Sequence, residues 1–230
     1  MDLLNSYKPG SNSLIKELPG LQSSNNSLLF ILRHGQIKGH ETKRFIGQTD
    51  VSLDDQGKNQ ALKWHKLFAS IRFNAVYSSS LKRCLDTAQV VCPKHDIHIV
   101  PSLNEINMGQ WDGKTFAEIK KDRPEEFKKR GSQIHQFRPA NGESFKDLSD
   151  RVLPFFNDIG KSQTQLKIKN SQNATGTSKI QNRARIPDNK ILVVTHAGVI
   201  RVLICHILGM NPEDLFEIKL DYGQLYVLKI

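Results

Sequence analysis

The sequence predicts one α/β domain with a largely parallel sheet that is covered by helices. Continuous apolar runs, as found in strands buried on both faces, occupy residues 27–32 and 191–195. Between them, strand patterns alternate with helical patterns, an order that is typical of parallel sheets. A chain of 230 residues, 38% of them hydrophobic, is long enough to bury one substantial core.

Five short segments carry strand patterns. They are residues 27–32, 74–78, 97–100, 191–195 and 222–230. The last of them alternates between apolar and polar residues, and we expect it at an edge of the sheet.

Six segments carry helical patterns, with apolar residues recurring three or four positions apart. They are residues 54–70, 81–91, 115–121, 125–130, 143–159 and 197–208. The second stops before Pro93, and Gly209 ends the last. Pro154 lies inside the pattern of residues 143–159 and should kink or divide that helix.

Two segments lack such periodicity. Residues 1–26 are rich in Ser, Asn, Gly and Pro, and we expect a poorly ordered leader there. Residues 161–190 are polar and basic, which favours a flexible surface insertion. The predicted organisation is therefore a flexible leader followed by a single domain over residues 27–230, interrupted by this insertion.

Composition narrows the function classes. Most of the net charge of +10 comes from residues 161–190, where no aromatic residues interleave the basic ones, so nucleic-acid binding is not favoured. No apolar run approaches the roughly 18–20 residues that cross a bilayer. The N-terminus lacks the features of a signal peptide, and we expect a cytoplasmic protein. Three cysteines without CxxC spacing indicate neither a disulfide framework nor a zinc site.

Two histidines share one local context although they are far apart in the sequence. His34 follows the apolar run 27–32, His196 follows the run 191–195, and a glycine comes soon after each. In open α/β sheets, ligands bind beyond the carboxyl ends of the strands. Two such ends on neighbouring strands would place both imidazoles in one site.

Two arginines are expected to join these histidines. Arg33 directly precedes His34, and Arg83 stands where the second predicted strand turns into its helix. The planar guanidinium matches phosphate oxygens two at a time and stays charged. A cation at a helix start opposes the helix dipole, which favours a ligand role for Arg83.

The motifs as a set resemble the histidine phosphatase superfamily, also called phosphoglycerate mutase-like. They are Leu32-Arg33-His34-Gly35, Ser79-Ser-Leu-Lys-Arg83, Leu103-Asn-Glu105 and Thr195-His196-Ala-Gly198. The resemblance implies a three-layer helix–sheet–helix fold with a mostly parallel central sheet and an edge strand. Within this family, the segments 44–53, 109–113 and 141–144 are most similar to the α-ribazole phosphatases of cobalamin assembly.

The resemblance also implies a role for each matching residue. His34 would be the nucleophile that forms a phosphohistidine, and Arg33, Arg83 and His196 would hold the phosphate oxygens. Glu105 would protonate the leaving group and then activate water. We expect further substrate contacts from Gly35, His40, Gln48, Thr49 and Ala197. The chemistry needs no metal and no organic cofactor.

Two positions depart from the family pattern. The histidine motif usually continues with Glu-Thr, whereas this chain has Gln36-Ile37. Relatives often place an asparagine six residues after the nucleophile, where this chain has His40. Both departures put the positioning of the substrate in question.

Three functions stay open on the sequence. The first is hydrolysis of a small phosphorylated metabolite, with α-ribazole 5′-phosphate as the named candidate, by a monomer or homodimer without nucleic-acid or membrane partners. The second is a phosphoglycerate mutase or a sugar-phosphate phosphatase. The third is a non-catalytic module that binds a phosphorylated ligand, with the altered Gln36-Ile37 context having removed catalysis.

Overall fold

The fold is built on one mixed β-sheet. The computed structural model describes residues 1–11, 13–14, 16–17, 27–172 and 189–230. Within these residues the sheet has six strands in the order β1-β6-β2-β5-β3-β4. Their bounds are β1 Asp2–Tyr7, β2 Leu28–Arg33, β3 Ala75–Ser78, β4 Ile97–Ile99, β5 Lys190–Thr195 and β6 Leu225–Lys229. The pairs β2–β5, β5–β3 and β3–β4 are parallel, and β6 is antiparallel to both β1 and β2. The sheet is therefore mostly parallel, as predicted.

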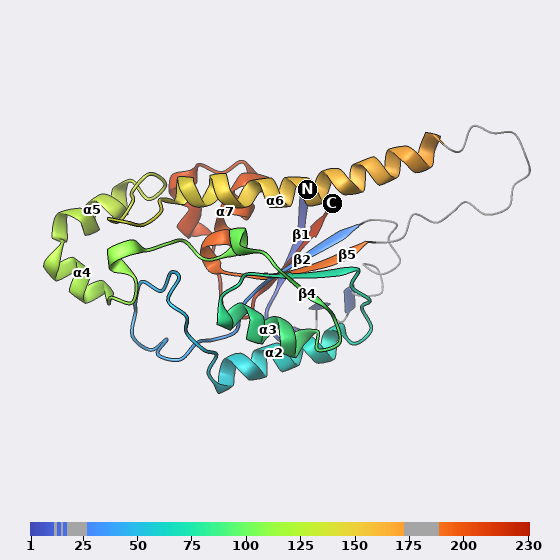
Figure 1. The fold of residues 1–230 in the computed structure, drawn as a ribbon, viewed down its shortest axis with the longest axis horizontal. Helices are drawn as coiled ribbons and strands as arrows, with labels where there is room; N and C mark the ends of the chain where they lie inside the picture. The colour runs from blue at the N-terminus through green and yellow to red at the C-terminus, as the bar shows by residue number, and fades with distance from the viewer. Residues whose placement is uncertain (12, 15, 18–26, 173–188) are drawn as a thin grey trace, which may run out of the picture.

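Helices cover both faces of this sheet (Figure 1). The α-helices are α2 Asp55–Phe68, α3 Lys82–Val91, α4 Phe116–Asp122, α5 Pro124–Ser132, α6 Phe145–Gln172 and α7 Ala197–Leu208. The described residues also form the short 3-10 helices η1 Pro101–Leu103, η2 Gly109–Trp111 and η3 Pro212–Glu217. Helices α6 and α7 lie on one face and α2 and α3 on the other. The predicted helix–sheet–helix layering is confirmed.

The alternation of side chains along β2 explains why the sheet is buried on both faces. Leu29 and Ile31 pack in the core with α6 and α7, whereas Leu28, Phe30 and Leu32 pack in the core with α2 and α3. Because both faces of the strand need apolar residues, the segment reads as an unbroken apolar run.

Capping residues explain where α2 and α4 begin and where α7 ends. Asp54 caps α2 by accepting from the backbone N–H of Gly57, and Thr115 and Glu118 form a capping box at α4. Gly209, with φ +61°, ends α7 in the left-handed conformation. The bounds of α7 are those predicted.

The structure corrects two predictions at the β1 side of the sheet. Residues 2–7, expected in a poorly ordered leader, form β1 and pair with β6. Strand β6, expected at an edge, therefore has a partner on each side. The segment 2–7 has a weak local pattern, and its strand conformation comes from pairing with the otherwise open backbone of β6. Residues 18–26 of the expected leader lie outside the described residues.

Helix α6 is longer than predicted. It continues from Phe145 to Gln172 and so includes the first part of the expected insertion over 161–190. Pro154 lies inside the helix without dividing it. Once a helix is nucleated, each added residue gains a hydrogen bond at little cost, so polar residues can extend it without an apolar face. Residues 173–188 lie outside the described part of the chain. In the described residues, no helix is long and apolar enough to span a bilayer.

Candidate active site

The two histidines meet at the carboxyl ends of neighbouring strands. His34 directly follows β2 and His196 directly follows β5, and these strands pair in parallel register up to Arg33 and Thr195. The backbone N–H of His34 donates to the carbonyl of Thr195 over 3.0 Å. The two imidazole rings lie 5.2 Å apart between centroids. Parallel pairing thus brings together residues that are remote in the sequence.

Hydrogen bonding fixes which nitrogen of His34 is free. Its Nδ1 lies 2.8 Å from the carbonyl oxygen of Gly35. Because a carbonyl oxygen only accepts, the proton of the neutral ring is on Nδ1, and Nε2 keeps a lone pair. Burial, with the charges of Arg33 and Arg83, holds the pKa of His34 well below its usual 6.5. The ring is therefore neutral at neutral pH, with a lone pair free on Nε2.

Gly35 permits the close packing that holds this histidine. A Cβ at Gly35 would lie 2.5 Å from the carbonyl oxygen of Gly57 in α2, too close for any side chain. The backbone N–H of Gly35 donates to Thr87 Oγ1 of α3 over 3.1 Å. The turn after β2 is thus attached to both helices on that face of the sheet.

Arg83 is buried, with 1% of its surface exposed, at the start of α3. Its Nη1 donates to the carbonyl of Thr49 (2.9 Å) and its Nη2 to that of Gly47 (2.7 Å). These acceptors are neutral, so the guanidinium charge is not cancelled by a carboxylate. A buried cation of this kind is stabilised by an anionic ligand.

Arg33 contributes a second positive charge. Its Nη1 donates to the carbonyl of Leu220 (2.9 Å), and its Cζ lies 4.0 Å from the ring centroid of Tyr222. Its Nε is buried without a hydrogen-bond partner. Burial lowers the pKa of Arg33. Among the ion pairs of the described residues, none involves Arg33 or Arg83, so both remain available to an anion.

His196 is held by Ser79 and Asn104, which stand in the family motifs but to which the sequence analysis gave no role. Its Nε2 lies 2.7 Å from Ser79 Oγ, which itself donates to Asn104 Oδ1 over 2.8 Å. Since the serine proton is used on Asn104, Nε2 of His196 carries the proton that it donates to Ser79. Burial and then Arg83 hold the pKa of His196 well below 6.5. Cys84 Sγ lies 3.3 Å from Nε2, but burial raises the pKa of its thiol, which excludes it as a nucleophile.

Glu105 reaches the same site from the loop after η1. One carboxylate oxygen accepts from the backbone N–H of Gly198 in the first turn of α7 (3.1 Å), where the helix dipole favours an anion. The other accepts from the backbone N–H of Ile106 (3.0 Å). A Cβ at Gly198 would collide with Glu105 Oε1, which accounts for the glycine two residues after His196.

Comparison with known proteins agrees with this arrangement. The model of the histidine phosphatase superfamily (branch 1) matches residues 29–168 and 178–230. The chain belongs to the histidine phosphatase superfamily. The match covers both histidines, both arginines and Glu105, and it begins after β1.

The relatives of this histidine phosphatase are named for several phosphate esters. An adenosylcobalamin/α-ribazole phosphatase of Escherichia coli is 27% identical over 85% of the chain and 86% of its own length. A glucosyl-3-phosphoglycerate phosphatase of Mycolicibacterium vanbaalenii is 29% identical over 81% of the chain and 76% of its own length. The crystal structure of a putative α-ribazole-5′-P phosphatase from Escherichia coli has a TM-score of 0.73 at 25% identity, covering 89% of this chain and 91% of the other.

The structure places the other expected substrate contacts in different surroundings. His40 and Thr49 line a cavity of 430 Å³ beside Tyr222, whose ring centroid is 5.7 Å from that of His34. Ala197 is buried as the first residue of α7. Gln48 and Thr49 cannot offer free backbone N–H groups to a substrate, because both already donate to Asp112. Sequence reasoning gave no role to Tyr222 or Asp112, although Tyr222 begins the predicted strand 222–230 and Asp112 stands in the segment 109–113 that resembles the family.

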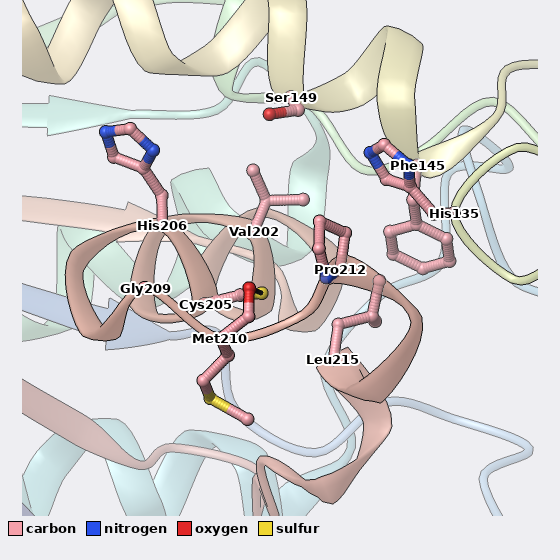
Figure 2. Close-up of a pocket in the computed structure, with 10 residues that line it drawn as sticks. All are labelled: His135, Phe145, Ser149, Val202, Cys205, His206, Gly209, Met210, Pro212 and Leu215. Carbon is pink, nitrogen blue, oxygen red and sulfur yellow. Dashed lines mark hydrogen bonds between the residues drawn. The ribbon is translucent and has the colours of Figure 1, made fainter.

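A second cavity of 220 Å³ lies on another part of this histidine phosphatase (Figure 2). Its walls come from α6, α7, η3 and His135, and none of the residues implied in phosphate chemistry lines it. Most of its lining is apolar, including Phe145, Val202 and Leu215. In the described residues, no group of three or more His, Cys, Asp or Glu side chains is arranged to hold a metal.

Proposed function

We propose that this histidine phosphatase hydrolyses a small phosphate monoester through a phosphohistidine on His34. The observation that supports it best is a neutral imidazole with a free Nε2 beside the buried Arg83 and the partly buried Arg33, which have no carboxylate partner among the described residues. That combination suits a phosphate dianion, which supplies the missing negative charge and the atom to be attacked.

In the first step, Nε2 of His34 forms a bond to phosphorus while the bond from phosphorus to the ester oxygen breaks. The bound phosphate dianion favours a proton on the neighbouring Glu105, which gives this proton to the departing oxygen, so an alcohol leaves. In the second step, the Glu105 carboxylate takes a proton from water as the water oxygen attacks phosphorus. The bond from phosphorus to Nε2 breaks, and inorganic phosphate and free His34 result.

Arg33, Arg83 and His196 would stabilise the charge on the phosphate oxygens throughout both steps. The unpaired Nε of Arg33 is one available donor. A dianion between the arginines would oppose their effect on His196 and raise its pKa, so that Nδ1 also becomes a donor.

We propose α-ribazole phosphate as the first substrate to test, because proteins named for it recur among the similar sequences and structures. A specific observation supports a second candidate, a phosphate ester whose alcohol part carries a carboxylate. The 430 Å³ cavity beside Tyr222 is lined by Lys38, Lys43 and Arg44, and no carboxylate lines it. Phosphoglycerate and phosphoserine therefore belong in the same screen.

The test is a hydrolysis screen across phosphorylated metabolites, combined with acid-labile trapping of the phosphoenzyme. We expect release of inorganic phosphate and a trapped phosphohistidine with the preferred ester. Activity that requires a bisphosphate primer, with negligible hydrolysis, would instead establish the mutase alternative. Ligand binding without either turnover or a trapped intermediate would establish the non-catalytic alternative.

A further inference from the structure

The loop over residues 47–49 lies between two opposite charges. On one side, Asp112 accepts from the backbone N–H groups of Gly47 (2.9 Å), Gln48 (2.8 Å) and Thr49 (3.0 Å). On the other side, the carbonyls of Gly47 and Thr49 accept from Arg83 at 2.7 and 2.9 Å. The loop therefore connects a carboxylate to the buried guanidinium of the candidate active site.

A single peptide unit makes both contacts. The peptide bond between Gly47 and Gln48 has its carbonyl on Arg83 Nη2 and its N–H on Asp112 Oδ2. Its dipole thus points its negative end at the cation and its positive end at the carboxylate. Hydrogen bonds to charged groups are the stronger ones, and bonds in a chain polarise one another. Removing the carboxylate would weaken the hold of this peptide on Arg83.

The surroundings leave the loop little freedom to find another conformation. A Cβ at Gly47 would lie 2.5 Å from the carbonyl oxygen of Ile106, so the loop is pressed against its neighbour. Asp50 accepts from the backbone N–H of Lys82 over 2.7 Å, which attaches the loop to the start of α3, next to Arg83. Loss of Asp112 would leave three N–H groups without their acceptor in this tight place.

We propose that Asp112 is a positioning residue that acts on catalysis through Arg83. This role of Asp112 rests on the proposed function, because the position of Arg83 matters only if Arg83 contacts the phosphate. Among the described residues, the loop uses two of the five guanidinium donors of Arg83, which leaves three for phosphate oxygens. Both carboxylate oxygens of Asp112 accept from the loop, so its effect would pass through Arg83 and not through contact with the substrate.

The test is a double-mutant cycle of Asp112→Asn with Arg83→Ala, measured by kcat, KM and the affinity for inorganic phosphate. An asparagine offers one acceptor oxygen and sets an NH₂ donor against backbone N–H groups. We expect Asp112→Asn to lower kcat/KM by about ten-fold or more, since a misplacement of about 1 Å can cost 10²-fold. In the Arg83→Ala protein, the same change should cause no further loss, because nothing is left to position.

Two further variants separate positioning from folding. Asp112→Glu keeps the carboxylate and should retain more activity than Asp112→Asn at similar thermal stability. Asp147→Asn is the matched control: Asp147 accepts from the backbone N–H of Ser144 (2.8 Å) at the start of α6 and pairs with the exposed Arg138, and it contacts none of the residues implied in phosphate chemistry. It should lower Tm and leave kcat unchanged.

The outcomes distinguish the two proposals. If the wild-type enzyme is active but the activity losses of Asp112→Asn and Arg83→Ala multiply in the double variant, the positioning role is overturned and the proposed function stands. A folded wild-type protein that hydrolyses no ester and binds no inorganic phosphate would refute the proposed function, and the role of Asp112 with it.

Discussion

His34 combines two properties that an exposed histidine lacks. Its Nδ1 is committed to the carbonyl of Gly35, and burial beside two arginines keeps the ring neutral. The first property leaves Nε2 as the nitrogen that would attack phosphorus in the proposed mechanism, and the second keeps its lone pair available. Both depend on the turn after β2, where Gly35 lets the chain pack against Gly57.

Removing the nucleophile should abolish turnover. We expect His34→Ala to lower kcat by a factor on the order of 10⁴ to 10⁶, as loss of a catalytic nucleophile does elsewhere. The fold should persist, because the strands around the site are held by their own ladders. Steady-state kinetics and phosphoenzyme trapping test this, with His206→Ala as a control on the outer part of α7. Normal turnover by His34→Ala would contradict the nucleophile assignment.

The pH profile should report the lowered pKa of His34. Attack requires the neutral ring, and a pKa well below 6.5 keeps it neutral as the pH falls through that value. The acid-side loss of kcat/KM, which reports the free enzyme, should therefore begin only well below pH 6.5.

Arg83→Ala tests the electrostatic cause of that shift. The change removes one of the two cations that lower the pKa of His34, so the acid-side loss should move to higher pH. The rate should also fall by at least about 10²-fold through loss of a preorganised charge contact. An unchanged pH profile would show that Arg83 does not contribute to the lowered pKa of His34.

Helix α7 positions the site through its first turn and ends at a glycine. His196 precedes the helix, and the N–H of Gly198 binds Glu105, so two groups of the site depend on where α7 begins. At the other end, Gly209 has φ +61° and nothing within 4 Å of where a Cβ would stand. Its requirement for glycine is therefore one of backbone conformation alone.

A pair of glycine substitutions tests this reasoning. Gly209→Ala should destabilise the protein by about 1 kcal/mol, because an L-residue is disfavoured in the left-handed region. Gly131→Ala, in α5 and equally open, should stabilise it by about 0.5–1 kcal/mol through helix propensity. Urea unfolding measures both, and kcat should be unchanged in each. The same sign for both variants would refute the conformational explanation.

At the scale of the whole molecule, β1 completes the sheet on its antiparallel side. It pairs with β6, which pairs in turn with β2, the strand that delivers His34. Without β1, the backbone groups along one side of β6 would lie at an open edge, which favours association with other chains.

Deletion of residues 2–7 should therefore lower Tm and promote self-association. Differential scanning calorimetry and light scattering measure the two effects. The match to the family begins after this strand, so the catalytic residues should remain and activity should survive at low temperature. Unchanged Tm and dispersity would show that β1 contributes nothing to the stability of the sheet.

Sequence patterns determined the layered fold and the main candidates for the site. The runs before His34 and His196 could be predicted as strands because strands buried on both faces need unbroken apolar residues. The end of helix α7 could be predicted because glycine is typical of helix C-termini, where the backbone adopts the left-handed conformation. The order of the motifs, together with the strand-end rule, indicated which polar residues share a site.

Only the tertiary structure decided the features that depend on remote partners. Strand β1 forms because β6 offers it a ladder, and its own six residues carry little pattern. Ser79 and Asn104 orient His196, and Asp112 binds backbone groups 63–65 residues earlier in the chain. Backbone N–H groups are the same at every position, so a side chain that binds them leaves no periodic or compositional trace in the sequence.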